Sequence, residues 1–306
     1  MSVMLCGVLS STINLRKVTM SLSPVAVVTG TSTGFGYDTA RLLAEAGYRV
    51  YGTMRDIPGR NADPAHRLSA LGITPVELDV TDQGSVDRAA AQILAAAGRV
   101  DVLINNAGTG HMGTAEAHSV ASFERQFATN VTGPFRVSRA FLPGMRANKS
   151  GLVVFVSSVI GRFVVPFTGV YSASKWALEA LAESFSYELR PFGVDVAIVE
   201  PGAYATNIVN VMITPDDAER LASYGDVAKT FDHILAGLTQ SAGQPIEVAQ
   251  AITDLVALPA GARPLRTVVP AASPAATIND STAPVQRAIL ENFGLGAFLP
   301  RQTAIV

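Results

Sequence analysis

The sequence contains one cysteine, Cys6, in 306 residues. A single cysteine cannot close a disulfide within the chain, and it excludes a cysteine-rich metal centre. We therefore expect a protein of a reducing compartment and predict a cytoplasmic location. The four histidines do not show the spacing of metal ligands within one helix, so no metal site is expected. All four are interpreted as ordinary loop or surface residues: His66, His111, His118 and His233.

Charge is also scarce. Only 16% of the residues are charged, whereas globular domains average about 25%. The 23 basic and 25 acidic side chains give a formal net charge of −2. Extensive disorder is thereby excluded, and no basic excess is present for non-specific binding of nucleic acid. We attribute the low charge to a sheet buried on both faces and to an apolar lid and subunit interface.

Long apolar runs are absent. The nearest candidate for a membrane span, residues 152–167, contains Arg162, so no span is expected. Residues 1–22 have a short apolar stretch without a preceding lysine or arginine and without a clear cleavage pattern. We interpret them as a loose N-terminal extension rather than a secretion signal.

Short apolar segments alternate with helix-length amphipathic segments. Strands that are apolar on both faces are typical of a parallel sheet covered by helices on both sides. The alternation predicts a Rossmann-type, doubly wound α/β fold with a seven-stranded parallel sheet. The expected strands are Val25–Thr29, Arg49–Met54, Pro75–Leu78, Val100–Asn105, Leu152–Ser157, Asp195–Glu200 and Leu265–Val269, and the expected helices include Tyr37–Ala46, Ser85–Ala97, Val120–Met145 and Tyr171–Leu189.

No repeat or linker divides residues 23–270, which we expect to form one domain. A partly apolar interval at about residues 203–245 follows a strand, where a lid over a ligand crevice would lie, although a surface excursion is the alternative. Within it, Pro215 with the two aspartates that follow is typical of a helix start. Residues 271–306 are expected to be a C-terminal tail, loop-like before a short helix near 285–292.

Three glycines, Gly30, Gly34 and Gly36, lie between a buried strand and an amphipathic helix. Glycine lets the backbone approach a pyrophosphate closely, and the helix N-terminus attracts the anion. A plain tight turn is the alternative, but it needs only one glycine. The pattern therefore favours a dinucleotide site.

The end of the second strand indicates which dinucleotide. An acid commonly holds the ribose 2′-hydroxyl there, but this chain has Met54 followed by Arg55. A guanidinium suits a 2′-phosphate. We predict NADP(H) as the preferred cofactor with NAD(H) possible, and the preference reverses if Asp56 faces the ribose.

Tyr171 and Lys175 are four residues apart at the start of a helical pattern, hence on one helix face. A nearby ammonium favours phenolate and lowers the pKa of a tyrosine toward neutrality, where the phenol can act as acid or base. Ser158 follows a strand and can hydrogen-bond a substrate oxygen. Such a pair is more often a solvated helix face, and the glycine loop is what makes chemistry the better interpretation.

With these motifs in order, the sequence resembles the short-chain dehydrogenase/reductase family, in its compact branch. The TGxxxGxG pattern spans residues 29–36, NNAG spans 105–108, and Tyr171 and Lys175 form YxxxK. Asn130 matches the catalytic asparagine, and Pro201-Gly202 matches the PG motif, with Thr206 downstream. The resemblance covers about residues 24–270.

The resemblance implies that Tyr171 exchanges the hydroxyl proton, that Lys175 lowers its pKa and holds the nicotinamide ribose, and that Ser158 polarises the substrate carbonyl. Asn130 would support a water-linked proton relay. Hydride transfer is the chemistry of the cofactor itself. The expected cofactor-binding residues are Gly30, Thr33, Gly34, Phe35, Gly36, Arg55, Asp79, Val80, Asn106, Ala107, Gly108, Tyr171, Lys175, Pro201, Gly202 and Thr206.

The expected reaction interconverts a lipophilic secondary alcohol and a ketone, or an aldehyde and an alcohol. The residues expected around the substrate are largely apolar, with Arg162 as an exception, and core packing is the alternative for each. They are Val159, Phe163, Val164, Phe167, Tyr204, Ile208 and Met212. A cofactor-binding regulatory protein, or an epimerase or dehydratase on the same scaffold, is the alternative function. The resemblance also implies a homodimer or homotetramer.

Overall fold

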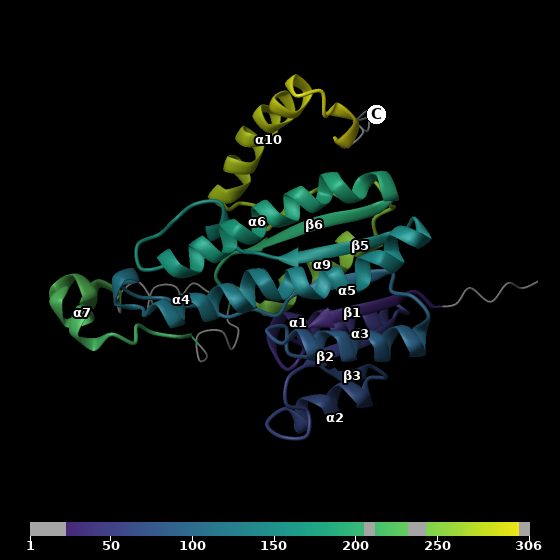
Figure 1. Ribbon diagram of the computed structural model, residues 1–306, viewed down its shortest axis with the longest axis horizontal. Coiled ribbons are helices and arrows are strands. Elements are labelled where there is room, and N and C mark those ends of the chain that lie inside the picture. Colours follow the sequence, from purple (N-terminus) through teal and green to yellow (C-terminus); the bar gives the residue numbers. More distant parts are fainter. Residues whose placement is uncertain (1–22, 205–211, 232–242, 300–306) are drawn as a thin grey trace, which may run out of the picture.

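The computed structural model describes residues 23–204, 212–231 and 243–299. Seven parallel strands form one sheet in the order β3-β2-β1-β4-β5-β6-β7, with helices on both faces (Figure 1). The predicted fold class is confirmed, and each predicted strand matches an observed one to within two residues at either end. The strands are β1 (Val25–Thr29), β2 (Arg49–Met54), β3 (Thr74–Glu77), β4 (Val102–Asn105), β5 (Gly151–Val156), β6 (Val194–Pro201) and β7 (Arg266–Val269).

The helices divide between the two faces of the sheet. On one face, α3 (Gln83–Ala97), α5 (Gly133–Asn148) and α6 (Gly169–Leu189) pack over alternate strand residues such as Val27 and Phe155. On the other, α1 (Gly34–Glu45), α2 (Ala62–Ala70) and α9 (Pro245–Ala257) cover Val28, Val154 and their neighbours. Two core layers around one buried sheet account for part of the low charge of the chain, because they bury strands on both faces.

Strand β1 pairs with β2 on one side and with β4 on the other. The strand order reverses at this point, and the carboxyl ends of the strands on either side open a crevice there. The glycine loop after β1 and the segment after β4 therefore meet at the carboxyl edge of the sheet. The ends of the two strands are hydrogen-bonded there, from Thr29 Oγ1 to the Ile104 carbonyl, although 75 residues separate them in sequence.

The helix predicted over residues 120–145 is wrong as a single element. The chain forms α4 (Val120–Phe127), a π-helical turn (Ala128–Thr132) and then α5. Pro134 has no amide hydrogen, and it is accommodated in the first turn of α5. Single π-helical turns inside helices are frequent at functional sites, and this one contains Asn130.

The loop-like segment predicted before a short C-terminal helix is also wrong. Helix α10 runs without a break from Pro274 to Asn292, and the hydroxyl of Ser273 caps it by accepting from the amide of Ala275. Ser followed by Pro is a helix-start signal that outweighs the weak helix propensity of the small and polar residues behind it. Only Ala275 of α10 is buried, and the helix projects from the body beside α6 (Figure 1).

Short elements complete the described part of the chain. They are α7 (Ala218–Ser223) and the 3₁₀ turns Ala115–Ala117, Val159–Gly161, Arg190–Phe192 and Gly296–Phe298. Helices α2 and α9 were not expected individually. No helix within the described ranges is long and apolar enough to cross a membrane.

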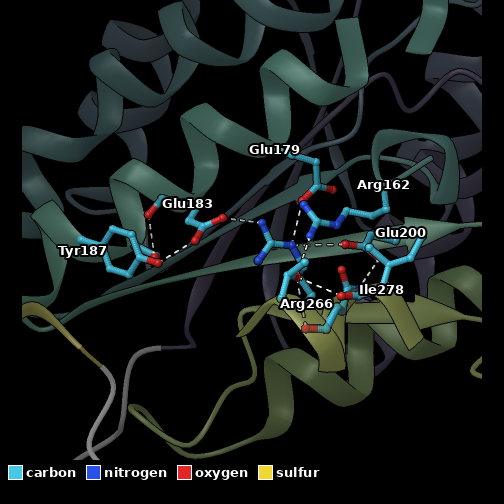
Figure 2. Close-up of polar contacts among 10 residues, drawn as sticks. Arg162, Glu179, Glu183, Tyr187, Glu200, Arg266 and Ile278 are labelled. Carbon is cyan, nitrogen blue, oxygen red and sulfur yellow. Dashed lines mark hydrogen bonds and ion pairs between the residues drawn. The ribbon is translucent and has the colours of Figure 1, made fainter. Parts of the chain in front are cut away.

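A buried ionic cluster joins α6, β6, β7 and α10 (Figure 2). Arg266 of β7 donates to Glu179 at 3.0 Å and to Glu183 at 2.6 Å, both on α6. Its Nε also lies 3.4 Å from Glu200 of β6, which in turn accepts a hydrogen bond from Asn279 of α10 at 2.7 Å. The cluster anchors the first half of α10 to the body and also bonds to α6, the helix whose first turn contains Tyr171.

Candidate active site

A cleft of about 840 Å³ lies at the carboxyl ends of the strands. It extends from the glycine loop after β1 to the first turns of α6. Many of the predicted site residues line it together, although they come from five separate stretches of the chain. These are Gly30, Thr33, Gly34, Phe35, Arg55, Asp79, Val80, Asn106, Ala107, Gly108, Tyr171 and Lys175.

The glycine loop is shaped to receive an anion. Gly30 and Gly34 have φ angles of +73° and +59°, and a Cβ on Gly30 would lie 2.9 Å from the Cα of Ala107. Thr33 is the N-cap of α1, but its side chain makes no capping hydrogen bond and no acid lies in the first turn. The amide donors and the dipole of α1 are therefore free to act on a ligand, which fits the pyrophosphate of a dinucleotide.

Gly36 and Asn106 support the loop in different ways. A Cβ on Gly36 would lie 2.3 Å from the Gly30 carbonyl oxygen, so glycine is needed there for packing and Gly36 does not line the cleft. The side-chain amide of Asn106 donates to the Thr29 carbonyl at 2.9 Å, and its backbone amide donates to the Thr29 hydroxyl at 3.0 Å. Asn106 thus ties the glycine loop to the end of β4.

The far end of the cleft carries basic side chains after β2. Arg55 lines the cleft with its side chain 55% exposed, and its Nη1 lies 3.9 Å from Asp79. Arg60, which the sequence analysis missed, also lines the cleft. Asp56 does not: its carboxylate accepts a hydrogen bond from the Arg60 amide at 3.2 Å, within its own loop. Met54 is buried.

Tyr171 lies at the other end of the cleft, with a hydrogen bond to Ser158. Burial raises the pKa of Tyr171 to about 12, and its hydrogen bond with Ser158 opposes this only in part. The predicted lowering by Lys175 is therefore wrong for this structure. The Lys175 ammonium lies 5.6 Å from the tyrosine ring centroid and donates to the Val156 carbonyl at 2.9 Å.

Burial also affects Lys175, in the opposite direction. It lowers the pKa of the ammonium to about 8, against the attraction of Glu179 one helical turn further on. The two residues of the pair are thus both shifted toward their neutral forms, as desolvation requires. At neutral pH Tyr171 is a phenol and Lys175 is still mostly charged.

The side chain of Asn130 is fully used inside the protein. Its Oδ1 accepts from the Thr109 amide at 2.9 Å, and its Nδ2 donates to the Thr109 carbonyl at 2.9 Å and the Ser174 hydroxyl at 3.1 Å. Asn130 is 1% exposed and does not line the cleft. Its amide holds the segment after β4 against α6.

The remaining predicted residues divide into three groups. Pro201 and Gly202 lie beside the cleft without lining it: the Pro201 carbonyl accepts from Ser158 at 3.3 Å, and the Gly202 amide donates to Val269 at 2.7 Å. Thr206 and Ile208 lie outside the described residues. Six predicted substrate contacts do not line the cleft, namely Val159, Phe163, Val164, Phe167, Tyr204 and Met212.

Tyr204, and Arg162 from the same predicted substrate region, have an observed structural role instead. Tyr204 packs edge-on against Phe35 and hydrogen-bonds Glu247, so core packing is the better interpretation for it. Arg162 donates to Thr282 of α10 rather than facing the cleft.

Several cleft residues were missed by the sequence analysis. They are Ser32, Arg60, Asn61, Leu78, Thr81, Thr109, His111, Arg125, Ala128, Thr129, Val156, Ser157 and Ile213. Most of them share one signal that could have found them, a position at the carboxyl end of a strand or in the loop that follows. Arg125, Ala128 and Thr129 lie instead at the end of α4 and in the π-helical turn, and Ile213 lies in the predicted lid. His111 and His118 lie in the loop that follows β4, as one interpretation of them allowed, but both are buried, so the interpretation as surface histidines is wrong.

The described part of the predicted lid is hydrogen-bonded to the segment after β4. Ile213 exchanges backbone hydrogen bonds with Gly110 and Met112. Asp216 accepts from both the amide and the hydroxyl of Ser119 at 2.7 Å. The predicted helix start is confirmed, since Asp217 caps α7. No group of three or more metal-ligating side chains occurs within the described ranges.

Known proteins are similar to this chain in sequence and in fold. A family model described as short chain dehydrogenase matches residues 24–216. A 3-ketodihydrosphingosine reductase from Bacteroides thetaiotaomicron is 38% identical over 186 residues, which are 61% of this chain and 66% of that protein. Human retinol dehydrogenase 8 is 35% identical over 252 residues, 78% of this chain and 79% of that protein.

A solved structure extends the similarity to the fold. The alcohol dehydrogenase from Thermococcus sibiricus, complexed with 5-hydroxy-NADP, is 28% identical and superposes with a TM-score of 0.66. The match covers 81% of this chain and 96% of that one.

Proposed function

This chain belongs to the short-chain dehydrogenase family and is an NAD(P)-dependent oxidoreductase, and from that premise we propose that it uses NADP(H) to interconvert lipophilic ketones and secondary alcohols. One observation carries the proposal. The buried hydroxyl of Tyr171, hydrogen-bonded to Ser158, lies at one end of the cleft whose other wall is the glycine loop. A proton carrier and a dinucleotide-binding loop therefore share one site.

The bound cofactor supplies the hydride, and the chain supplies the proton and the positioning. Because the pKa of Tyr171 is about 12, its hydroxyl is protonated at neutral pH and can donate to the carbonyl oxygen during reduction. The Ser158 hydroxyl donates to the Pro201 carbonyl at 3.3 Å. This hydrogen bond is long, and Ser158 can exchange it for one to the substrate oxygen.

Lys175 and Asn130 support this proton transfer. The ammonium of Lys175 uses one hydrogen on the Val156 carbonyl, which leaves two for the nicotinamide ribose. The side-chain amide of Asn130 is already engaged. We therefore assign its part in a proton relay to the backbone carbonyl of Asn130 in the π-helical turn. A bound water can link this carbonyl to Lys175.

The preference for NADP(H) is supported by the charge at the ribose end of the cleft. Arg55 and Arg60 line it together with the hydroxyl of Thr33, while Asp56 is turned away. Two guanidinium groups and a hydroxyl suit a 2′-phosphate. The similar alcohol dehydrogenase is complexed with 5-hydroxy-NADP, which agrees with this assignment.

The lipophilic substrate class is supported by the names of the relatives, a retinol dehydrogenase and a 3-ketodihydrosphingosine reductase. Assembly into a homodimer or homotetramer is a separate part of the proposal. It is supported by exposed apolar side chains on the two helices expected at the interface, Val120 and Phe123 on α4 and Trp176 on α6. Sedimentation analysis that finds only monomers would refute the assembly.

The decisive experiment measures NADPH oxidation optically with a panel of aliphatic, aromatic and steroid ketones. Activity on several of these ketones, with little on small carboxylated ketones, supports the proposal. Tyr171→Phe should lose turnover while still binding NADPH. Equal rates for the variant and the wild type would overturn the mechanism, and a cofactor-binding protein without turnover would show no oxidation with any ketone.

A further inference from the structure

Gln126 of α4 lies in a buried hydrogen-bond network beside the cleft. Its Nε2 donates to the Thr109 carbonyl at 2.9 Å and to the Ser174 hydroxyl at 3.1 Å. The Ser174 hydroxyl gives its own hydrogen to the Tyr171 carbonyl at 2.7 Å, so toward Gln126 it can only accept. The Gln126 amide therefore has one orientation, with both N–H groups used and Oε1 left as an acceptor.

This orientation determines where the proton sits on His111. The Nδ1 of His111 is hydrogen-bonded to Oε1 of Gln126. Since Oε1 has no hydrogen, Nδ1 must be the donor. Burial lowers the pKa of His111, so the ring is neutral at neutral pH. A neutral imidazole with its hydrogen on Nδ1 has a lone pair on Nε2, which makes Nε2 an acceptor.

The Nε2 of His111 has no hydrogen-bond partner within the described part of the chain. The residue is 1% exposed and lines the same cleft as Tyr171 and Lys175. Proteins rarely keep a buried acceptor without a donor, because its lost hydration is not compensated. The nearby ring of His118, 5.7 Å away between centroids, makes no hydrogen bond with it.

We propose that Nε2 of His111 accepts a hydrogen bond from the substrate, so that the enzyme prefers lipophilic ketones that carry a hydroxyl group in addition to the carbonyl. The inference rests on the proposed function, because Tyr171 must receive the carbonyl in the same cleft. His111 takes no part in the proton transfer and recognises only the second polar group.

The network also makes the preference depend on geometry. Ser174 and Gln126 connect His111 to the first turn of α6, which carries Tyr171. The two contact points for the substrate are therefore held at a constant separation. Only hydroxyketones whose hydroxyl lies at the matching distance from the carbonyl should gain.

The test uses straight-chain ketones of equal length, each with a hydroxyl at a different distance from the carbonyl, and their parent ketone without the hydroxyl. We expect one position to raise kcat/KM with NADPH by about 10-fold or more over the parent, as for a site built around a hydrogen bond. His111→Asn keeps an N–H for Gln126 but lacks an acceptor in place of Nε2. It should abolish the gain, so that the kcat/KM of that hydroxyketone divided by the kcat/KM of the parent ketone falls to about 1.

His118→Phe is the matched control, since His118 is a buried neighbour that does not line the cleft, and it should keep the preference. If His111→Asn fails to fold, His111→Phe fills the ring volume without an acceptor and has the same expected result. The inference is overturned if no hydroxyl position gives a gain, or if the gain survives in the His111 variant. In either case, reduction of the parent ketone by the wild type would still support the proposed function.

Failure of the proposed function has a different signature. If the wild type reduces no ketone, calorimetric titration with the same compounds decides the inference separately. Tighter binding of one hydroxyketone than of the parent, lost in His111→Asn, supports the role of His111. Equal binding of the hydroxyketones and the parent overturns it.

Discussion

Asn279 of α10 donates a hydrogen bond of 2.7 Å to Glu200, a carboxyl group at the end of β6 with no solvent exposure. Burial, and then the charge of Glu179, raise the pKa of Glu200 from its ordinary 4.5 to about 7. Glu200 directly precedes Pro201, whose carbonyl accepts from Ser158. The C-terminal helix is thus bonded to the strand end that supports the candidate active site.

The raised pKa of Glu200 predicts how stability changes with pH. Between about pH 4.5 and pH 7 the unfolded chain has released this proton while the folded chain retains it, so stability falls as pH rises through that window. At about 1.4 kcal/mol per pKa unit, the loss amounts to at most about 3.5 kcal/mol. Glu200→Gln should remove it, and urea midpoints at about pH 5 and pH 8 measure the change.

Glu183→Gln is the control for this prediction. The hydrogen bonds from Tyr187 and Arg266 lower the pKa of Glu183 against the effect of burial, so its stabilising contribution is present above the ordinary pKa and is lost as pH falls. The Gln variant should therefore be less stable than the wild type at pH 8. A Glu200→Gln protein with the same pH dependence as the wild type would contradict the assignment.

The pKa of Tyr171 predicts the pH dependence of the reaction. Because the phenol stays protonated up to about 12, reduction should be independent of its ionisation from about pH 6 to pH 8. Oxidation needs the phenolate, so its rate should rise with pH over the same range. A reduction rate that falls with an apparent pKa near 7 would contradict a protonated Tyr171.

Tyr171→Phe should lower kcat by about 100-fold to 10,000-fold, the usual contribution of a proton donor. Tyr187→Phe is a matched control, because Tyr187 lies on the same helix but does not line the cleft and donates to Glu183 instead. It should retain activity. Steady-state rates with NADPH and one reduced ketone provide the comparison.

Arg55→Leu tests the cofactor preference. Removing this guanidinium should weaken NADPH by about 10-fold to 100-fold, since hydrogen bonds to charged groups contribute about 1.5–3 kcal/mol. NADH, which lacks the 2′-phosphate, should bind as before. Fluorescence titration of both cofactors measures this, with Arg41→Leu on the outer side of α1 as the control. An equal loss for both cofactors would place Arg55 elsewhere than at the 2′-phosphate.

Ser174→Ala tests the buried network. The hydroxyl accepts from both Asn130 and Gln126 and is 0% exposed, so its loss leaves two amide donors without one of their acceptors. We expect a destabilisation of about 1–3 kcal/mol in urea unfolding and a lower kcat from the displaced segment after β4. Unchanged stability would show that the two amides find other partners.

Much of the fold and the site could be predicted from the sequence because the relevant signals are local. Alternating apolar segments define strands and helices over a few residues, which is why β1 and β2 match the prediction at both ends. The three glycines and the spacing of Tyr171 and Lys175 are likewise visible in short windows. The π-helical turn was missed because it does not interrupt the local helical periodicity. The length of α10 was missed because the small and polar residues behind Ser273 and Pro274 have weak helix propensity.

The sequence by itself thus determined the order of the elements, the glycine loop and the placing of Tyr171 and Lys175 on one helix. Only the tertiary structure decided the direction of the Tyr171 pKa, the engagement of the Asn130 amide and the burial of His111. The physical reason is that desolvation and hydrogen-bond pairing depend on which distant segments come together. Thr109, Gln126 and Ser174 lie far apart along the chain, and folding alone makes them one network.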